Sequence, residues 1–392
     1  MAKRKGLIAV AAVVAIVSTV VTGTLVGLVV ANYQHLGRLA RVVRLVTTEY
    51  LEPVTMSGLV DGAMKGMVAS LKDPYSSYMS PEEYKHLYEQ IQGSFTGIGV
   101  YISKKDMNKT VIVSPIKGGP ADRAGLKAGD VISKVNGEDV TSMDVDIVVS
   151  KIKGPEGTEV ALTVFREAEK RFMDLTLTRE VVNIPVVTAE LAKQNEQIGV
   201  IKIAQFNQTA AAEVDKAVQA FMDKKVRGFI LDLRDNPGGE LDAAVDIASY
   251  FVPEGPVVYV VDNRGVEEIY NTTHTQIDLP VVVLVNEGSA SASEIVAGAI
   301  KDSGTGSLVG NKTFGKGIVQ SVIQLDAGSA VKLTTAKYLT PKKNDIHKIG
   351  IEPDVKVELP KDANGLALEA KEGEPDQVME KGIEVLKTMM PQ

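Results

Sequence analysis

Ser291 ends a turn that follows the fully apolar run Val281–Val285 and leads into a stretch with the composition of a helix. The run predicts a buried strand, and a serine in the following turn can be presented at the tip of a sheet. The positive end of the helix would there favour negative charge that develops on a reacting group. Ser289, Ser291 and Ser293 are also good N-cap residues, so helix capping is an equally simple explanation, and both interpretations can hold together.

Lys316 lies between two glycines in the segment Thr313–Gln320. If this segment is a strand, Lys316, Ile318 and Gln320 point to the same face, so the lysine and the glutamine can address one site. A lone lysine is usually a solvated cation. The chain nevertheless offers no plausible Ser-His-Asp set, and a buried lysine can have its pKa lowered enough to act as a general base. Gln320 could then hold the amine in place, as a third group orients the base in other catalytic triads.

A third segment, Leu233–Gly239, follows an apolar run and ends in Gly-Gly before a helical stretch. Its exposed backbone N–H groups are those that an oxyanion hole requires, although a tight turn explains the glycines equally well. The spacing of the glycines does not match the pattern of dinucleotide-binding loops. The segment therefore adds a candidate oxyanion hole to the candidate nucleophile and base.

The composition of the 392 residues excludes several other classes of chemistry. The formal net charge is −7 and no dense basic stripe occurs, which argues against nucleic-acid binding. The absence of cysteine rules out disulfides, thiolate metal sites and cysteine catalysis. The four histidines are scattered, with no pair four residues apart, so we expect neither a metal site nor a cofactor.

The N-terminus carries a basic cluster, Lys3–Lys5, followed by the uncharged segment Gly6–Ala31. As a helix this segment would span about 39 Å, enough to cross a bilayer with some tilt. It is longer than the apolar region of a cleavable signal peptide, which is the alternative, so the sequence favours an uncleaved signal anchor. The basic cluster predicts a cytoplasmic N-terminus, a single pass through the cell membrane and an extracytoplasmic body.

The pattern of the whole chain predicts an α/β multidomain protein. Apolar residues recur at helical spacing from about Tyr33 to Gln92, and short β-branched runs separated by turn residues follow as far as Val182. From Asn183 onward strands and helices alternate, which indicates a largely buried sheet flanked by helices. We expect an anchor at 1–31, a helical region at 32–92, a small β-rich module at 93–182, an α/β core at 183–360, and a linker with a C-terminal helix at 361–392.

Three motifs of the C-terminal half resemble those of the carboxyl-terminal processing proteases, serine peptidases related to the bacterial tail-specific protease. The motifs are Gly288–Ile295, the Lys-Gly at Lys316, and the Asn-Pro-Gly-Gly turn Asn236–Gly239. The resemblance extends from about Arg38 to the C-terminus. It implies that the α/β core is a serine protease domain.

The same resemblance implies a role for each matching residue. These roles are nucleophile for Ser291, general base for Lys316, partner of the base for Gln320, and oxyanion hole for Gly238 or Gly239 together with Ala292. Asp302 corresponds to an aspartate described in some family members, and we expect it to be auxiliary or structural. The stretch Lys343-Asn344 is more polar than is usual in the family, but it lies outside these motifs.

The module at 93–182 resembles a PDZ domain of the circularly arranged type found in bacterial proteases. Gly97, Ile98, Gly99 and Val100 look like its carboxylate-binding loop, and Gly119–Ile132 matches its most recognisable stretch. Such a module implies that the C-terminal tails of protein substrates bind by strand addition, with loop amides receiving the terminal carboxylate.

Together these features predict a membrane-anchored endopeptidase that docks a substrate's tail and cleaves within the substrate chain through an acyl-enzyme. An inactive scaffold that only binds tails is the alternative, and the presence of serine, lysine and glutamine in register argues against it. The apolar stripes of Tyr33–Leu71 and of the tail Asp376–Met390 exceed what one compact core needs. We therefore expect a homodimer formed through the terminal regions, as the family resemblance also implies.

Overall fold

A computed structural model describes residues 18–19, 22–23, 35–105, 109–358 and 375–390 of the chain. Most of the predicted signal anchor, Gly6–Ala31, and nearly all of the predicted polar linker lie outside the described residues. Within the described part, no helix combines the length and the apolar character needed to cross a membrane. The chain divides into two compact units, residues 1–78 and residues 79–392.

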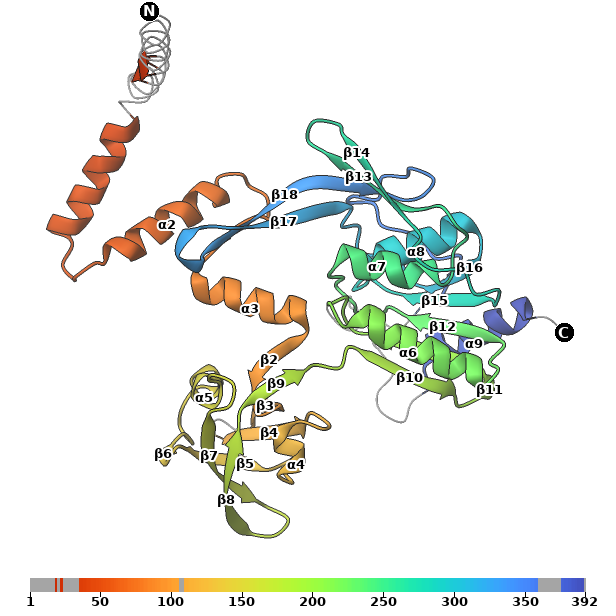
Figure 1. Cartoon of the computed structure of the whole chain (residues 1–392), viewed down its shortest axis with the longest axis horizontal. Helices are drawn as coiled ribbons and strands as arrows, with labels where there is room; N and C mark the ends of the chain where they lie inside the picture. The colour runs from red at the N-terminus through yellow and green to blue at the C-terminus, as the bar shows by residue number, and fades with distance from the viewer. Residues whose placement is uncertain (1–17, 20–21, 24–34, 106–108, 359–374, 391–392) are drawn as a thin grey trace, which may run out of the picture. The chain divides into compact units, whose positions relative to one another are not determined.

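The first unit is helical, as predicted. One helix covers residues 35–49, and α2 covers Met56–Ala69 (Figure 1). The hydroxyl of Thr55 caps α2 by accepting a hydrogen bond from the N–H of Gly58 at 3.2 Å. A short strand, β1, covers Ser77–Met79. Large apolar side chains of both helices are exposed, and no residue of α2 is buried. The apolar stripes predicted for the N-terminal region are thus real and largely uncovered.

The helix α3, Pro81–Gln92, begins after its N-cap residue Ser80. Ser80 and Glu83 form a capping box, in which the Ser80 N–H donates to the Glu83 carboxylate at 2.8 Å and the Glu83 N–H donates to the Ser80 hydroxyl at 3.3 Å. At the other end of α3, the carbonyl oxygen of Ile91 accepts a hydrogen bond from the N–H of Gln208 at 3.0 Å. This bond joins the end of the helix to the C-terminal domain.

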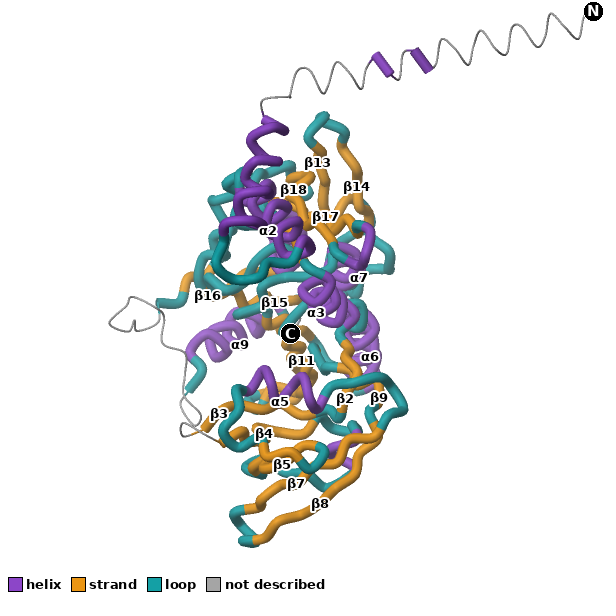
Figure 2. Tube along the Cα trace, turned by 90° about the vertical axis from the view of Figure 1, so that its left-hand side faces the viewer, coloured by secondary structure: helices purple, strands orange, loops and turns teal. Residues whose placement is uncertain are grey.

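The β-rich module contains a sheet in the order β3-β4-β5-β7-β8, with β6 paired to β5 (Figure 2). Its elements are β2 (Ser94–Gly97), β3 (Val100–Lys105), β4 (Lys109–Pro115), α4 (Pro120–Arg123), β5 (Val131–Val135), β6 (Glu138–Asp139), α5 (Val145–Ile152), β7 (Glu159–Arg166), β8 (Arg171–Thr178) and β9 (Glu180–Asn183). Strands β2 and β9 pair with each other, so the two ends of the module meet. Its core includes Ile98, Ile132 and Val148. The short strands predicted for this module are confirmed, and the helices α4 and α5 lie between them in the chain.

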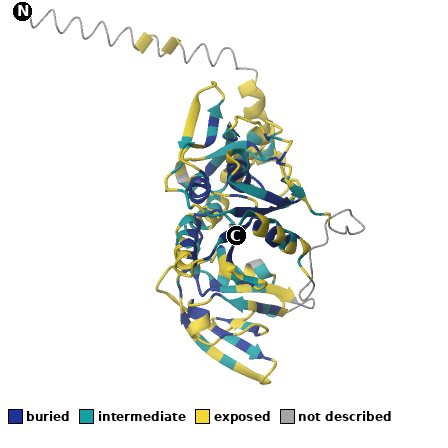
Figure 3. Ribbon diagram, turned by 90° about the vertical axis from the view of Figure 1, so that its right-hand side faces the viewer, coloured by how far each residue is buried: buried dark blue, intermediate teal, exposed yellow. Residues whose placement is uncertain are grey.

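A six-stranded sheet forms the centre of the C-terminal domain, in the order β10-β11-β12-β15-β16-β19 (Figure 1). β10 is antiparallel to β11, and the other neighbours are parallel. The strands of this sheet and three helices of the domain are, in chain order, β10 (Val187–Ala192), β11 (Asn195–Ile203), α6 (Ala210–Asp223), β12 (Gly228–Asp232), α7 (Leu241–Ser249), β15 (Val281–Val285), α8 (Ala292–Ser303), β16 (Gly306–Gly310) and β19 (Val355–Lys356). Every residue of β12 and β15 is buried, as their continuous apolar sequences predict (Figure 3).

The two faces of this sheet pack against different helices. Side chains alternate along a strand, so Phe229 and Leu231 of β12 join the cluster that contains α6, α7 and α8, whereas Ile230 joins the opposite cluster. The opposite cluster includes Val378, Ile383 and Leu386 of α9, which covers Gln377–Met389. The tail helix therefore completes the core of its own chain.

This packing contradicts the prediction that the C-terminal helix takes part in a dimer interface. The apolar side chains of α9 are buried against their own sheet and are not available to a second copy. The N-terminal end of α9 is also fixed, because the Arg234 guanidinium pairs with Asp232 at 2.6 Å and with Asp376, the N-cap of α9, at 2.9 Å. Of the two terminal regions, only the one at residues 35–71 leaves its predicted apolar stripes largely exposed in the described structure.

A second, antiparallel sheet contains β13 (Pro256–Asp262), β14 (Glu267–Asn271), β17 (Ile318–Gln324) and β18 (Ala330–Leu339), with a short 3₁₀ turn at Asp326–Gly328. The prediction that Lys316 and Gln320 share one face of a strand is wrong. β17 begins only at Ile318, and its pairing with β18 shifts between Val319 and Gln320. A register shift breaks the two-residue alternation, so strand periodicity does not place Gln320 beside Lys316.

Candidate active site

Ser291 occupies the sharp turn between β15 and α8, at the N-cap of the helix. Its backbone φ of +55° and ψ of −115° are rarely adopted by a residue with a side chain, and such strain is commonly stored at functional sites. The side chain is half-buried rather than enclosed. The turn thus presents the hydroxyl at the carboxyl edge of the sheet, next to the positive end of α8.

The two flanking serines have structural roles that distinguish them from Ser291. Ser289 and Ser293 are fully buried. The hydroxyl of Ser289 donates to the carbonyl oxygen of Leu233 at 2.8 Å, and that of Ser293 donates to the carbonyl oxygen of Asn236 at 2.9 Å. Both bonds join the serine-rich turn to the segment Leu233–Gly239. Of the three serines, Ser291 is the one with an accessible side chain.

The segment with Gly238 and Gly239 packs directly against Ser291. A Cβ on Gly238 would lie 2.7 Å from the Cβ of Ser291 and 2.9 Å from the amide nitrogen of Ala292. A Cβ on Gly239 would collide with the carbonyl group of Phe206. Both glycines also have positive φ values, of +99° and +144°. Glycine is therefore required at both positions for this backbone to approach Ser291 so closely.

Hydrogen bonds fix the direction in which this turn presents its N–H groups. The N–H of Gly238 donates to the Asn236 side chain at 2.9 Å, and the Asn236 amide donates in turn to the carbonyl oxygen of Ile203 at 2.8 Å. Phe206 holds the other side, because its N–H donates to the Gly238 carbonyl at 3.0 Å. Since the Gly238 N–H is already used within the turn, Gly239 is the better of the two predicted oxyanion donors, beside Ala292.

Lys316 lies just before β17 in a segment that hydrogen bonds hold on both sides of the lysine. The carbonyl oxygen of Gly315 accepts from the N–H of Lys348 at 2.8 Å, and that of Gly317 accepts from the N–H of Tyr338 at 3.1 Å. The lysine side chain is half-buried. Burial lowers the pKa of Lys316 and the nearby charge of Lys332 lowers it further, while the carboxylate of Glu294 acts in the opposite direction.

Glu294 connects the two candidate catalytic segments, and the sequence analysis assigned it no role. Its fully buried carboxylate accepts hydrogen bonds from the N–H of Ser291 at 3.0 Å and from the N–H of Lys316 at 2.8 Å. It also accepts from the N–H of Gly315 at 2.7 Å and from the hydroxyl of Thr313 at 2.6 Å. The spacing Ser-x-x-Glu, which is typical of a capping box, was the signal available in the sequence.

Tyr338 is a second residue that sequence reasoning missed. Its hydroxyl donates to the carbonyl oxygen of Ser291 at 3.1 Å, and it also lies within hydrogen-bond reach of Glu294. Burial and the charge of Glu294 raise the pKa of Tyr338 well above its usual value, so the phenol remains a neutral donor. Tyr338 therefore supports the strained Ser291 backbone from the antiparallel sheet.

Gln320 and Asp302, the remaining predicted residues of this site, make contacts to other parts of the chain. Gln320 pairs with Thr334 across β17 and β18, and its amide nitrogen lies 3.5 Å from the carbonyl oxygen of Ile318. Asp302 lies in the last turn of α8 and accepts a hydrogen bond from the N–H of Lys342 at 2.9 Å. This bond joins the end of α8 to the loop that follows β18.

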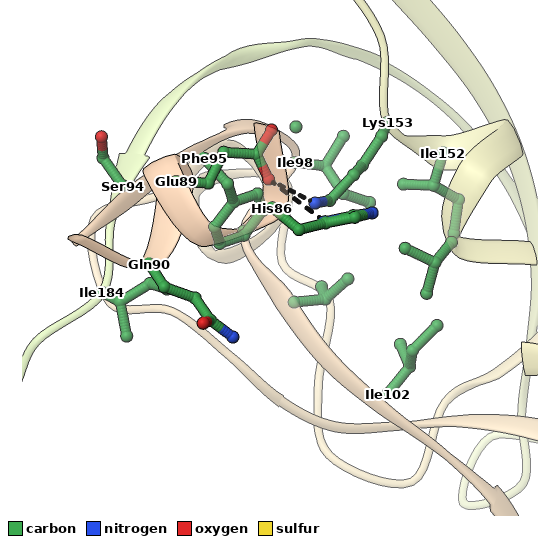
Figure 4. A pocket seen from close by; sticks show the side chains of 14 residues that line it. His86, Glu89, Gln90, Ser94, Phe95, Ile98, Ile102, Ile152, Lys153 and Ile184 are labelled. Atoms are coloured by element: carbon green, nitrogen blue, oxygen red, sulfur yellow. Dashed lines mark hydrogen bonds and ion pairs between the residues drawn. The ribbon is translucent and has the colours of Figure 1, made fainter. Parts of the chain in front are cut away.

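The predicted carboxylate-binding loop, Gly97–Val100, joins β2 to β3 and lines a cavity of about 260 Å³ (Figure 4). The carbonyl oxygen of Ile98 accepts from the N–H of Ala121 at 2.8 Å, and that of Gly99 accepts from the N–H of Ile116 at 2.9 Å. These bonds fix the loop beside the cavity. In the part of the chain that the structure describes, no group of three or more histidine or acidic side chains is arranged to hold a metal ion.

Comparison with family models matches three parts of the chain. Residues 197–357 match peptidase family S41, residues 111–166 match a PDZ domain, and residues 22–83 match the N-terminal domain of the activating protease CtpB. The matched ranges follow the helical region, the β-rich module and the α/β core described above. Residues 84–110, which contain α3 after its first turn, lie outside all three ranges.

Curated relatives resemble the chain over most of its length. The carboxy-terminal processing protease CtpA of Bacillus subtilis is 43% identical over 317 residues, which are 80% of this chain and 67% of the relative. A carboxyl-terminal-processing protease of Synechocystis sp. is 39% identical over 302 residues, 76% of this chain and 71% of the relative. The solved structure of a putative S41 protease from Bacteroides fragilis covers 89% of this chain and 97% of its own, with a TM-score of 0.52 and 17% identity, and shares the fold.

The contacts of Glu294 predict the cost of removing its charge. Glu294→Gln keeps the shape but places an amide NH₂ against backbone N–H groups, leaving buried donors unsatisfied. We expect the free energy of unfolding to fall by about 1–3 kcal/mol. Glu287→Gln, an exposed position in the same turn, is the matched control and should change it by less than about 0.5 kcal/mol. Urea denaturation measures both, and equal stabilities for the two variants would contradict the role assigned to Glu294.

Proposed function

The chain belongs to the carboxyl-terminal processing proteases of peptidase family S41 and is a serine-type peptidase, and from this premise we propose that Ser291 is its nucleophile and Lys316 its general base. The observation that carries the assignment is the single buried carboxylate of Glu294, which accepts a hydrogen bond from the backbone N–H of each residue. The lowered pKa of Lys316 supports it, because a general base must be able to lose its proton.

The reaction then follows the course of acyl transfer. Neutral Lys316 takes the proton of the Ser291 hydroxyl as Oγ attacks the carbonyl carbon of the scissile peptide bond. The N–H groups of Gly239 and Ala292 stabilise the oxyanion, aided by the positive end of α8. Lys316 returns the proton to the leaving amine as the C–N bond breaks, which leaves an acyl-enzyme. Water, deprotonated by the same lysine, hydrolyses the ester and frees Ser291.

Gln320 is proposed to orient the Lys316 amine in the reacting state. Both residues are half-buried and belong to one short stretch of chain. The bulge before Gln320 allows its side chain to be directed differently from that of a regular strand. Asp302 is proposed to act only indirectly, by holding the loop that follows β18.

The substrates proposed for this site are proteins whose C-terminal tails dock on the PDZ domain. The support is the cavity beside Gly97–Val100, which lies next to strand β3 and helix α5. A tail would add as a strand to β3 and place its carboxylate on the loop amides. Cleavage would then occur within the substrate chain, at a bond that reaches Ser291. A scaffold that only binds tails does not require the Glu294 network.

The dyad assignment predicts the behaviour of two single variants and their combination. Ser291→Ala and Lys316→Ala should each lower kcat by at least about a thousandfold without unfolding the protein, and the double variant should lose little more, because dyad members act as a unit. Lys312→Ala, an exposed lysine four residues earlier, is the matched control and should retain activity. Hydrolysis of an internally quenched peptide measures all four, and normal turnover by folded Lys316→Ala would refute the assignment.

The pH profile gives the same assignment a second readout. Because the base acts when neutral, the rate should fall as the pH falls through the lowered pKa of Lys316. Lys332 contributes a repelling positive charge, so Lys332→Gln should raise that pKa and move the acid limb to higher pH. An acid limb that does not move in Lys332→Gln would mean that another group titrates.

Tail recognition predicts a dependence on the free carboxylate. Amidating the C-terminus of a tailed substrate removes the charge that the loop amides would receive, so cleavage should slow through a higher KM with the scissile bond unchanged. A short peptide without a docking tail is the control and should be cleaved equally well with either terminus.

Deletion of residues 93–182 separates two possible roles of the PDZ domain. If the domain only delivers substrates, its deletion slows the cleavage of tailed substrates alone. If it inhibits the enzyme at rest, its deletion speeds the cleavage of short peptides. Rates unchanged by amidation and by deletion would exclude both roles.

Membrane attachment and dimerisation are proposed from the N-terminal region. The basic cluster and the uncharged segment Gly6–Ala31 support a single-pass anchor with an extracytoplasmic body. The exposed apolar side chains of the helices at residues 35–71 support a homodimer formed there. Deleting residues 1–31 should release an active body from membranes, and sedimentation should find that body dimeric at micromolar concentration. Retention on membranes or a strictly monomeric body would contradict the respective proposal.

A further inference from the structure

The cavity beside the loop Gly97–Val100 has two walls of different origin (Figure 4). One wall belongs to the PDZ domain and is apolar, formed by Ile98, Ile102, Val149 and Ile152. The other wall is formed by His86, Glu89 and Gln90 of α3, together with Ile184. In Figure 4, Gln90 and Ile184 lie on one side of the cavity and Ile102 and Ile152 on the other. A helix outside the matched PDZ range thus closes a site that a PDZ domain usually forms alone.

Specific contacts fix α3 in this position. The Lys153 ammonium, at the end of α5, pairs with the Glu89 carboxylate at 2.7 Å, and the two side chains are only 29% and 20% exposed. The same ammonium lies 5.6 Å from the centre of the Phe95 ring. Just after α3, the carbonyl oxygen of Gly93 accepts from the N–H of Ile184 at 2.8 Å. The wall formed by α3 is therefore held in place by specific contacts with the PDZ domain.

We propose that α3 forms part of the tail-binding site and that Gln90 contacts the substrate residues that precede the C-terminal one. This inference rests on the proposed docking of tails. Side chains of a strand alternate between two sides, so a tail added to β3 directs some residues to the apolar wall and others away from it. We expect the residues that point away from the apolar wall to face the wall formed by α3. The Glu89 charge is balanced by Lys153, whereas Gln90 is exposed and uncharged, so a charge introduced at Gln90 would act on the nearest substrate residue.

Substitutions of opposite charge at Gln90 test the contact. Binding is measured by fluorescence anisotropy in the full chain carrying Ser291→Ala, so that the labelled peptides stay intact. The peptides share one apolar C-terminal residue and carry Lys or Asp at the second, third or fourth position from the end. At one or more positions, Gln90→Lys should favour the Asp peptide about threefold and Gln90→Glu the Lys peptide about threefold, as expected of a partly screened charge pair. Gln92→Lys and Gln92→Glu, on the same helix but outside the cavity, should leave both affinities unchanged.

The outcomes separate this inference from the proposed function. If the protein binds no free-carboxylate tail better than its amidated form, tail docking fails, and the inference fails with it. If tails bind but the Gln90 variants do not change the preference, or the Gln92 variants change it equally, α3 is not part of the site and tail docking stands. Opposite shifts that appear only at Gln90 establish α3 as the second wall.

Discussion

The hydrogen bonds to the carboxylate of Glu294 are the interaction on which the catalytic arrangement depends. Two oxygen atoms receive N–H groups from Ser291, Gly315 and Lys316 and a hydroxyl from Thr313. A buried charge is stable only when such donors replace the water it has lost. The turn before α8 and the segment before β17 depend on the same anion, so neither can shift without leaving it short of donors. The positions of the proposed nucleophile and of the proposed base thereby depend on one buried carboxylate rather than on two independent loops.

In the serine-rich motif, two of the three serines have structural roles and surround Ser291, the proposed nucleophile. Beyond the end of β15, the hydroxyls of Ser289 and Ser293 donate to backbone carbonyl oxygens of the segment that carries Gly238 and Gly239. These bonds hold that segment against the serine-rich turn. Asn236 continues this network into β11 by donating to Ile203. The strained backbone of Ser291 is maintained because the hydrogen bonds of Ser289 and Ser293 fix the chain on both sides of it.

The sequence predicted the regular elements better than the geometry of the site. Val281–Val285 is a strand with the predicted bounds, because a continuous apolar run is a local signal. Lys316 was placed in a strand wrongly, since the start of β17 and its bulge depend on pairing with β18, which no local pattern encodes. The role of Glu294 depends on a segment that follows it by 22 positions, which no local pattern shows.

The short connection Phe206–Gln208 has a mechanical consequence. The carbonyl oxygen of Phe206 accepts from the N–H of Glu240 at 2.7 Å beside Gly239, while the N–H of Gln208, two residues further along, donates to Ile91 at the end of α3. Two residue steps span at most about 7 Å, so both bonds are made by one very short length of chain. The end of α3 and the backbone beside Gly239 are therefore held by the same three residues. Through this connection, the helix that lines the PDZ cavity is linked directly to the proposed oxyanion hole.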